Sequence, residues 1–168
     1  KDTAPAQVAK GVAAVKDVLK DRLTKRQITK QQFDDQMSLV SGTTEYTGFG
    51  RLPLVIEAVF EELGVKHKVI AEAETVLPQD AIFATNTSTI PIAKIAAGSK
   101  RPEQVIGMHF FSPVHKMPLL EVIVTPRTAP EVTATVVEFG RRIGKTVIIV
   151  NDAPGFYVNR ILAPYVNE

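Results

Sequence analysis

The feature that most constrains the fold is a series of short, uniformly apolar runs. They occupy residues 54–59, 81–85, 105–111, 119–125 and 146–150. Strands that are apolar throughout, instead of alternating with polar residues, are typical of parallel sheets that helices cover on both faces. The sequence therefore predicts a doubly wound α/β fold built around a mainly parallel sheet.

Segments with helical periodicity separate most of these runs. A capping box formed by Thr29 and Gln32 predicts the start of one helix, which is expected to end near Leu39. Only a proline-containing loop lies between 105–111 and 119–125, and it is too short for a helical crossover. These two strands are therefore expected to pair antiparallel. A first helix is predicted from the helical spacing of Val8, Val12, Val15 and Leu19, with Thr3 and Pro5 as start signals. The other predicted helices cover 65–77, 91–97, 132–144 and the segment from Phe156 onward.

Composition narrows the class of protein. The chain has 168 residues, of which 45% are hydrophobic and 23% are charged, enough apolar material for one domain with a sizeable core. Its net charge of +2 gives no electrostatic argument for binding nucleic acid or a membrane surface. The absence of Cys excludes disulfides and thiolate metal sites. No apolar run approaches the roughly 20 residues that a membrane-spanning helix needs.

Two titratable residues lie inside apolar runs, His109 in 105–111 and Glu121 in 119–125. A buried imidazole needs a hydrogen-bond partner, and a buried carboxylate costs free energy unless it is paired. The two side chains are therefore natural partners if their strands are neighbours. Such a pair fixes the imidazole tautomer and favours acid–base catalysis. The alternatives are a core histidine bonded to a backbone carbonyl, a structural ion pair, and a solvent-facing glutamate.

Polar residues also follow two of the predicted strands. Ligands of open α/β sheets bind beyond the carboxyl ends of the strands. Glu57 and Glu61 lie around the end of the first run, and the segment 86–89 follows the second. That segment is a helix N-cap cluster, a polar substrate site, or both at once.

The histidines do not predict a metal site. His67 lies between two lysines on a predicted helix and is expected on the solvated surface. His109 and His115 have no third ligand at a suitable spacing, and the chain has no HExxH motif. It also lacks a G-x-G-x-x-G turn, a P-loop and a G-x-S-x-G elbow. Residues 151–155 predict at least a turn that starts a helix.

Four segments resemble, in this order, the signatures of the L-3-hydroxyacyl-CoA dehydrogenase family. They read IEAVFEELGVKHKV, FATNTSTIPI, GMHFFSPVHKMPLLEVI and NDAPGFYVNR. The resemblance covers nearly the whole chain, and it is strongest to the α-subunit of the multifunctional fatty-acid oxidation complex. It implies a Rossmann-like domain that binds NAD and an enzyme of β-oxidation that oxidises the 3-hydroxyl of an acyl-CoA to a ketone.

The resemblance also implies roles for single residues. His109 matches the base that takes the hydroxyl proton, and Glu121 matches the residue that orients and charge-balances its ring. Ser88 and Asn159 match positions that hold the substrate near this base. The matched cofactor-binding positions are Asp2 at the adenosine ribose, Ala58 along the cofactor path, Glu61 and Lys66 near the nicotinamide ribose and the CoA chain, and Ser112. Many members have Asn where this chain has Ser in the FFSP run, so a tuned contact is expected there.

Within the resemblance, residues 1–150 correspond to a partial NAD-binding domain and 151–168 to the start of a C-terminal helical domain. The sheet is expected to be incomplete at its N-terminal βα unit, because the glycine-rich turn is expected to precede residue 1. The chain alone is then expected to bind NAD weakly or not at all. The implied partners are an acyl-CoA substrate and the hydratase and thiolase parts of a β-oxidation complex. The expected location is the bacterial cytoplasm, or an organelle matrix in a eukaryote.

Two other interpretations stay open at this point. One is a catalytically silent interaction module of a multienzyme complex, which would associate with partner subunits without cofactor. The other is a related 3-hydroxybutyryl-CoA enzyme, which only chain-length kinetics would separate from the first interpretation. A G-x-G-x-x-G motif about 20 residues upstream of Asp2 would favour the dehydrogenase.

Overall fold

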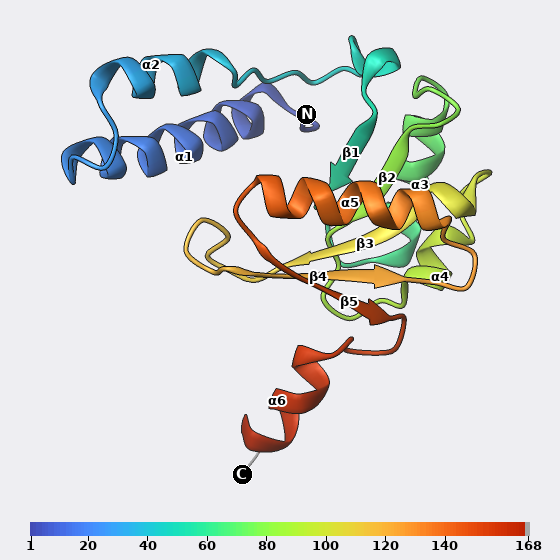
Figure 1. Ribbon diagram of the computed structural model, residues 1–168. Coiled ribbons are helices and arrows are strands. Elements are labelled where there is room, and N and C mark those ends of the chain that lie inside the picture. The colour runs from blue at the N-terminus through green and yellow to red at the C-terminus, as the bar shows by residue number, and fades with distance from the viewer. Residues whose placement is uncertain (167–168) are drawn as a thin grey trace. The chain divides into compact units, whose positions relative to one another are not determined.

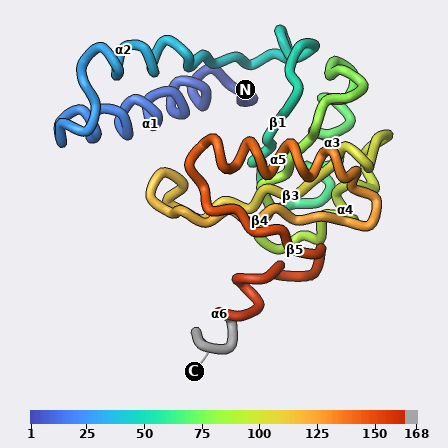
Figure 2. Tube along the Cα trace, viewed as in Figure 1, coloured from blue at the N-terminus to red at the C-terminus, as the bar shows by residue number. Residues whose placement is uncertain are grey.

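A computed structural model describes residues 1–166 of the chain (Figure 1). The chain divides into two compact units, Lys1–Gly48 and Phe49–Glu168, each with its own internal contacts. Along the trace in Figure 2, the first unit is coloured in blues and the second runs from teal to red.

The first unit contains two helices. α1 (Pro5–Thr24) begins with a proline in its first turn, where a missing amide hydrogen costs no helical hydrogen bond. α2 (Lys30–Ser38) begins with the predicted capping box, in which Gln32 N donates to Thr29 Oγ1 at 3.1 Å and Thr29 N donates to Gln32 Oε1 at 2.9 Å. The helical prediction for this part of the chain is confirmed. Residues 40–48 form no helix or strand.

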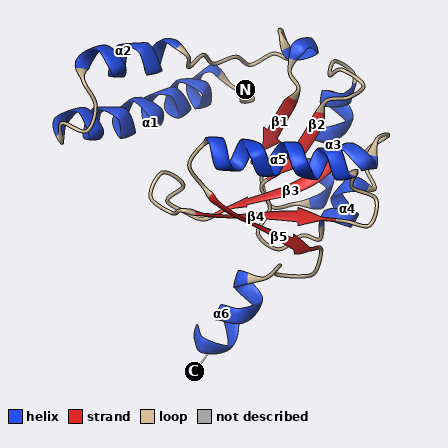
Figure 3. Cartoon of the chain, in the orientation of Figure 1, coloured by secondary structure: helices blue, strands red, loops and turns tan. Residues whose placement is uncertain are grey.

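A five-stranded sheet forms the centre of the second unit (Figure 3). Its strands, in spatial as well as sequence order, are β1 (Leu54–Glu57), β2 (Ile82–Thr85), β3 (Val105–Phe110), β4 (Leu119–Val124) and β5 (Thr146–Asn151). Neighbouring strands are parallel, apart from the antiparallel pair β3 and β4. The structure therefore confirms the mainly parallel α/β fold and the antiparallel pair that the short loop predicted.

Helices cover the sheet on both faces (Figure 1). α5 (Pro130–Arg142) packs on β4 and β5, and α4 (Ile92–Ala96) packs on β3 with α3 (Leu63–Glu74) beside it. Because successive side chains of a strand point to opposite faces, Gly107 and His109 lie on the α4 side of β3. The main core lies on the α5 side and contains Ile82, Ala84, Ile106, Met108, Leu120, Val122, Val132 and Val136.

Gly107 explains how α4 approaches the sheet so closely. A Cβ atom at Gly107 would lie 2.8 Å from Ile92 Cδ1 of α4 and 2.8 Å from the Cβ of Ile123 on β4. Ile92 and Ile95 of α4 are completely buried. The α4 face of the sheet is therefore closely packed up to His109, the next residue of β3 on that face.

Helix and strand bounds shift by one to three residues from the sequence predictions, as in α3 and α5. The strand predicted at 54–59 ends at Glu57, because its pairing with β2 ends at Thr85. The helix predicted from Phe156 is α6 (Val158–Val166), and a turn precedes it. His67 is half-buried and not solvated, since its Nε2 lies 2.8 Å from Lys94 O and its ring packs against Gly98.

Candidate active site

The carboxyl ends of β1, β2 and β3 meet at one edge of the sheet, where ligands of such sheets bind. Asn86 joins these ends through its backbone N and its side-chain Oδ1. Its backbone N donates to Glu57 O at 2.8 Å, and its Oδ1 accepts from Phe110 N at 3.1 Å. The residues that follow β1 and β2 are thereby held next to the end of β3, which carries His109.

His109 and Glu121 form a hydrogen-bonded pair at this edge. They lie directly opposite each other in the antiparallel ladder of β3 and β4. His109 Nδ1 lies 2.7 Å from Glu121 Oε2, and the two residues are 4% and 0% exposed. The partnership that two apolar runs predicted is therefore present. A backbone partner for the imidazole and a solvent-facing glutamate are both excluded.

The second oxygen of Glu121 is also occupied. Oε1 accepts from Tyr157 N at 3.1 Å and from Val158 N at 2.9 Å, at the start of α6. A carboxylate that receives hydrogen bonds on both oxygens is held as an acceptor in a fixed orientation. It also satisfies two backbone donors that a helix N-terminus otherwise leaves unpaired.

These contacts fix the tautomer of His109. Because Glu121 accepts at Oε2, Nδ1 of His109 carries the hydrogen and donates it. The lone pair of the neutral ring then lies on Nε2. Among the side chains that the structure describes, residues 1–162, none forms a hydrogen bond with that atom. The rings of Phe111 and Phe156 lie 4.5 Å and 5.6 Å from the imidazole, so apolar surface surrounds it. Chemically, this arrangement suits a general base that accepts at Nε2, and that role stays a prediction.

The two residues predicted to hold substrate are brought together. Asn159 Nδ2, on α6, donates to the backbone oxygen of Ser88 at 3.2 Å. Ser88 lies in the loop between β2 and α4 and is exposed, and Asn159 is half-buried. Both residues belong to loops or helix ends that surround the end of β3. Their roles toward a substrate remain predictions.

Glu61 organises the loop that carries Ser88. Its Oε1 accepts from Thr87 Oγ1 at 2.5 Å, from Ser88 N at 2.9 Å, and from Thr89 N and Oγ1 at 3.0 and 3.2 Å. Burial raises the pKa of Glu61, but these hydrogen bonds and the charge of Lys66 outweigh it and lower the pKa from 4.5 to about 2. The carboxylate therefore stays ionised and holds three consecutive residues of the loop.

The lowered pKa of Glu61 predicts a pH-dependent contribution to stability. The pKa of this carboxyl is about 2 in the folded chain and 4.5 in the unfolded chain. The folded chain therefore binds fewer protons at this group than the unfolded chain does. The contribution of Glu61 is complete above about pH 4.5 and is lost as the pH falls toward 2. The stability advantage of the wild type over Glu61→Gln should therefore be larger at pH 6 than at pH 3, as measured by denaturant unfolding. An equal difference at both pH values would contradict the network.

Lys66 forms an ion pair with Glu57. Its ammonium is completely buried, 2.6 Å from Glu57 Oε1 and 3.6 Å from Glu61 Oε2. Thr85 Oγ1 also donates to Glu57 Oε1, at 3.0 Å. Glu57 Oε2 is buried and has no hydrogen-bond partner among the described residues. Lys66 thus acts on the loop through Glu61 in this structure, and a direct contact with cofactor or CoA stays a prediction.

The other predicted cofactor residues of the second unit lie at the same edge. Ala58 follows β1 directly and is exposed, and the neighbouring Phe60 is 84% exposed. Ser112 is exposed in the loop after β3 and precedes Pro113 through a cis peptide bond. The segments that follow β1 and β3 thus expose small, apolar and hydroxyl side chains.

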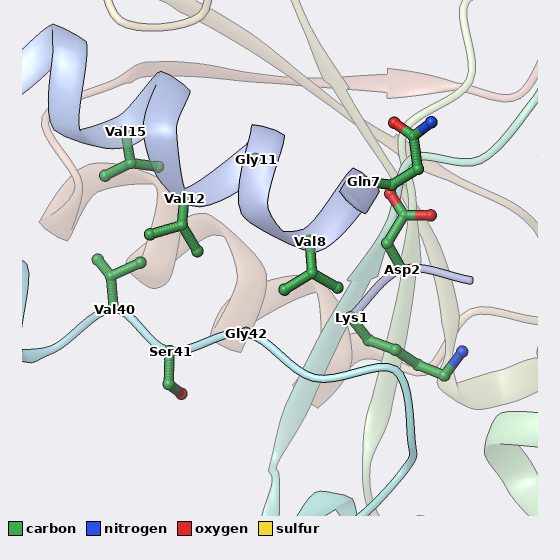
Figure 4. A pocket seen from close by; sticks show the side chains of 10 residues that line it. All are labelled: Lys1, Asp2, Gln7, Val8, Gly11, Val12, Val15, Val40, Ser41 and Gly42. Atoms are coloured by element: carbon green, nitrogen blue, oxygen red, sulfur yellow. The ribbon is translucent and has the colours of Figure 1, made fainter. Parts of the chain in front are cut away.

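Asp2 belongs to the first unit and lies at one end of a pocket there (Figure 4). The pocket has a volume of about 230 Å³, and the valines of α1 face the segment 40–42 across it. Asp2 Oδ1 accepts from Thr3 N at 2.7 Å, and Asp2 N donates to Thr43 O at 3.1 Å. The predicted contact of Asp2 with an adenosine ribose remains a prediction.

Asp152 is a polar residue of this region whose role the sequence did not predict. Its carboxylate accepts from Ile92 N and from Ala93 N, both at 2.8 Å, at the start of α4. The sequence indicated only a turn at 151–155, because the partners of Asp152 lie 60 and 59 positions away along the chain. An acidic residue directly after an apolar strand was the one available signal.

The described residues show neither a metal centre nor a membrane helix. Within 1–166, no group of three or more His, Asp or Glu side chains is arranged to hold a metal ion. No helix in the same part of the chain has the length and apolar character to cross a bilayer.

Comparison with known proteins gives consistent matches. Residues 1–153 match the family model of the 3-hydroxyacyl-CoA dehydrogenase NAD-binding domain. The crystal structure of (S)-3-hydroxybutyryl-CoA dehydrogenase PaaH1 from Ralstonia eutropha is 37% identical, with a TM-score of 0.96 over 99% of this chain and 59% of that chain. FadB2 of M. tuberculosis is 36% identical, with a TM-score of 0.94 over 98% of this chain and 59% of its own.

A third similar structure is the 3-hydroxybutyryl-CoA dehydrogenase of Escherichia coli K12. It is 33% identical, with a TM-score of 0.94 over 99% of this chain and 35% of that chain. The chain thus spans about three fifths of the length of the first two relatives. A model match over 153 of 168 residues, together with this fold and these identities, shows that the chain belongs to the 3-hydroxyacyl-CoA dehydrogenase family and corresponds to its NAD-binding domain.

Proposed function

We propose that this chain is the catalytic part of an NAD-dependent dehydrogenase that oxidises the 3-hydroxyl of an L-3-hydroxyacyl-CoA to a ketone. The observation that supports this most is the buried His109–Glu121 pair, whose Nε2 is free at the ligand-binding edge of the sheet. Two of the similar structures are named 3-hydroxybutyryl-CoA dehydrogenases, which agrees with this reaction class.

The residues at the edge of the sheet fit the nicotinamide half of the cofactor. NAD, when bound, supplies the hydride acceptor. A ribose needs hydrogen-bond acceptors for its hydroxyls, and Glu61 offers an ionised carboxylate whose side chain is 38% exposed. Ala58 and Phe60 offer exposed apolar surface beside it for a flat ring. Ser112 adds a hydroxyl that donates or accepts.

His109 is the base of the proposed reaction. Its Nε2 takes the proton of the 3-hydroxyl, so that the oxygen keeps the electron pair that becomes the second bond of the ketone. The ring is then an imidazolium, and the Glu121 carboxylate next to Nδ1 balances its charge. Ser88 and Asn159 lie at the mouth of this arrangement and orient the acyl group toward Nε2.

The wider setting of the reaction is proposed on similarity alone. Oxidation of a 3-hydroxyacyl-CoA is a step of fatty-acid β-oxidation, in which hydratase and thiolase parts are the expected partners. The three relatives are bacterial, which supports a bacterial source, and the cytoplasmic location stays a prediction. The C-terminal helical domain predicted to begin at residue 151 stays a prediction.

The test is direct. The full-length protein is mixed with NAD and L-3-hydroxybutyryl-CoA or longer homologues, and NADH formation is followed by absorbance, with the D enantiomer as control. We expect turnover with the L substrates only. NAD binding by calorimetry should be weaker for the 168-residue chain than for the full-length protein, since the chain has no glycine-rich phosphate turn. No NAD binding by either protein would instead favour a silent interaction module.

A further inference from the structure

We propose that Asp152 is a positioning residue that sets how Asn159 and Ser88 lie relative to His109. It does so by fastening the turn after β5 to the N-terminus of α4. This inference rests on the proposed function, because that function places all three residues around one substrate. Asp152 itself is not proposed to touch the substrate or the cofactor.

The contacts of Asp152 reach two layers of the fold. Its backbone N donates to Val124 O at 3.0 Å, which continues the ladder of β4 and β5 by one residue. Its carboxylate accepts from Ile92 N and Ala93 N, at 2.8 Å each. The residue that precedes α4 is Pro91, and it makes no side-chain cap. Asp152 therefore supplies from a distant part of the chain the cap that α4 lacks locally.

α4 is a firm attachment point for this cap. Ile92 and Ile95 are completely buried, and Ile92 packs against Gly107 in the layer of the sheet that carries His109. The loop with Ser88 leads directly into α4. Hydrogen bonds to the first two amides of α4 therefore fix the position of the turn after β5 relative to both His109 and Ser88.

The turn itself adopts a conformation that needs support. Gly155 and Phe156 have φ angles of +72° and +53°, and Phe156 N donates to Ala153 O at 2.9 Å. A left-handed conformation is unfavourable for a residue such as Phe156, which has a side chain. Its ring is nevertheless 2% exposed and lies 5.6 Å from the imidazole of His109. The surrounding contacts must therefore hold the turn in place.

Those contacts lie at both ends of the turn. Asp152 fastens its entry to α4, while Glu121 accepts from the amides of Tyr157 and Val158 at its exit. Asn159 then reaches Ser88 O at 3.2 Å. Without the Asp152 contact, only the hydrogen bonds to Glu121 hold the strained turn in place. The expected result is a displacement of Asn159, with little change at Glu61 or Ala58.

The experiment compares Asp152→Asn and Asp152→Ala with the wild type in the full-length enzyme. In Asp152→Asn the side-chain NH₂ group faces one of the two backbone amides of α4. The hydrogen bond to that amide is lost, while the size of the side chain is kept. We expect kcat/KM for the acyl-CoA to fall about 10- to 100-fold, with a raised KM for the acyl-CoA. The KM for NAD should change less than about twofold, because the Glu61 edge is untouched.

A merely structural role predicts a different pattern. Loss of folded enzyme lowers kcat but changes neither KM, since the remaining molecules are normal. Glu131→Gln is the matched control, because Glu131 is an exposed acidic residue in the first turn of α5. That control should leave all kinetic constants unchanged. If Asp152→Ala does not fold, Asp152→Asn carries the kinetic comparison.

Amide hydrogen exchange tests the fastening without any substrate. Exchange at Ile92, Ala93, Tyr157 and Val158 should be faster in Asp152→Asn than in the wild type. Unchanged exchange overturns the fastening, and faster exchange with an unchanged KM for the acyl-CoA overturns the positioning role. An inactive wild type with faster exchange in the variant would overturn the proposed function while leaving the fastening in place.

Discussion

Replacing His109 with Gln is expected to lower kcat for L-3-hydroxyacyl-CoA oxidation by about 10³-fold, the size that a lost general base produces. Gln keeps a polar side chain of similar reach, but it cannot accept a proton near neutral pH. Binding of NAD should be unchanged, because the Glu61 edge does not depend on the imidazole. The measurement is steady-state NADH formation by the full-length enzyme, together with calorimetric titration of NAD.

The matched control is His115→Gln. His115 is an exposed histidine in the loop between β3 and β4, so the same chemical change occurs close by in the chain but outside the buried pair. We expect its kcat to stay within about twofold of the wild type. Equal losses in the two variants, or a His109→Gln enzyme with normal kcat, would remove His109 from the reaction.

The sequence predicted this pair because both residues are polar and titratable within otherwise apolar strands. A histidine and a glutamate inside uniformly apolar strands each need a partner, and the short loop between the strands placed them side by side. The same logic predicted the parallel sheet and the antiparallel pair. Local patterns of this kind are readable because the constraint lies within a few residues of the position that it affects.

The rest of the site depends on contacts between distant residues, which one sequence does not display. Lys66 is a lysine on a helical face, and only the fold shows that its ammonium is buried against Glu57. Glu61 reads as a polar residue near a strand end, whereas the structure makes it the acceptor for three consecutive loop residues. Asp152 caps a helix that begins about 60 positions earlier. Each contact needs tertiary structure before its chemistry can be derived.

The two carboxylate oxygens of Glu121 accept hydrogen bonds from different donors. Oε2 receives the Nδ1 hydrogen of His109, and Oε1 receives the amides of Tyr157 and Val158. A glutamine in its place has one accepting oxygen and one donating amide group. One set of donors must therefore face a donor, which costs about 1–3 kcal/mol of folding free energy for the unsatisfied group.

The consequence for activity follows from where the amide group settles in Glu121→Gln. Two backbone amides bind the remaining oxygen more strongly than one imidazole does, so the NH₂ group is expected to face Nδ1. The ring then accepts at Nδ1 and carries its hydrogen on Nε2, the nitrogen that must receive the substrate proton. We expect kcat to fall by about 10³- to 10⁴-fold, as for other catalytic histidines held in the wrong tautomer.

The tautomer can be observed separately from the rate. Nitrogen NMR of the His109 ring in the full-length enzyme should report hydrogen on Nδ1 in the wild type and on Nε2 in Glu121→Gln. A low kcat with the wild-type tautomer would mean that Glu121 acts through the charge of the imidazolium and not through ring orientation. A normal kcat with the exchanged tautomer would contradict proton transfer to Nε2, because that nitrogen has no free electron pair in the exchanged form.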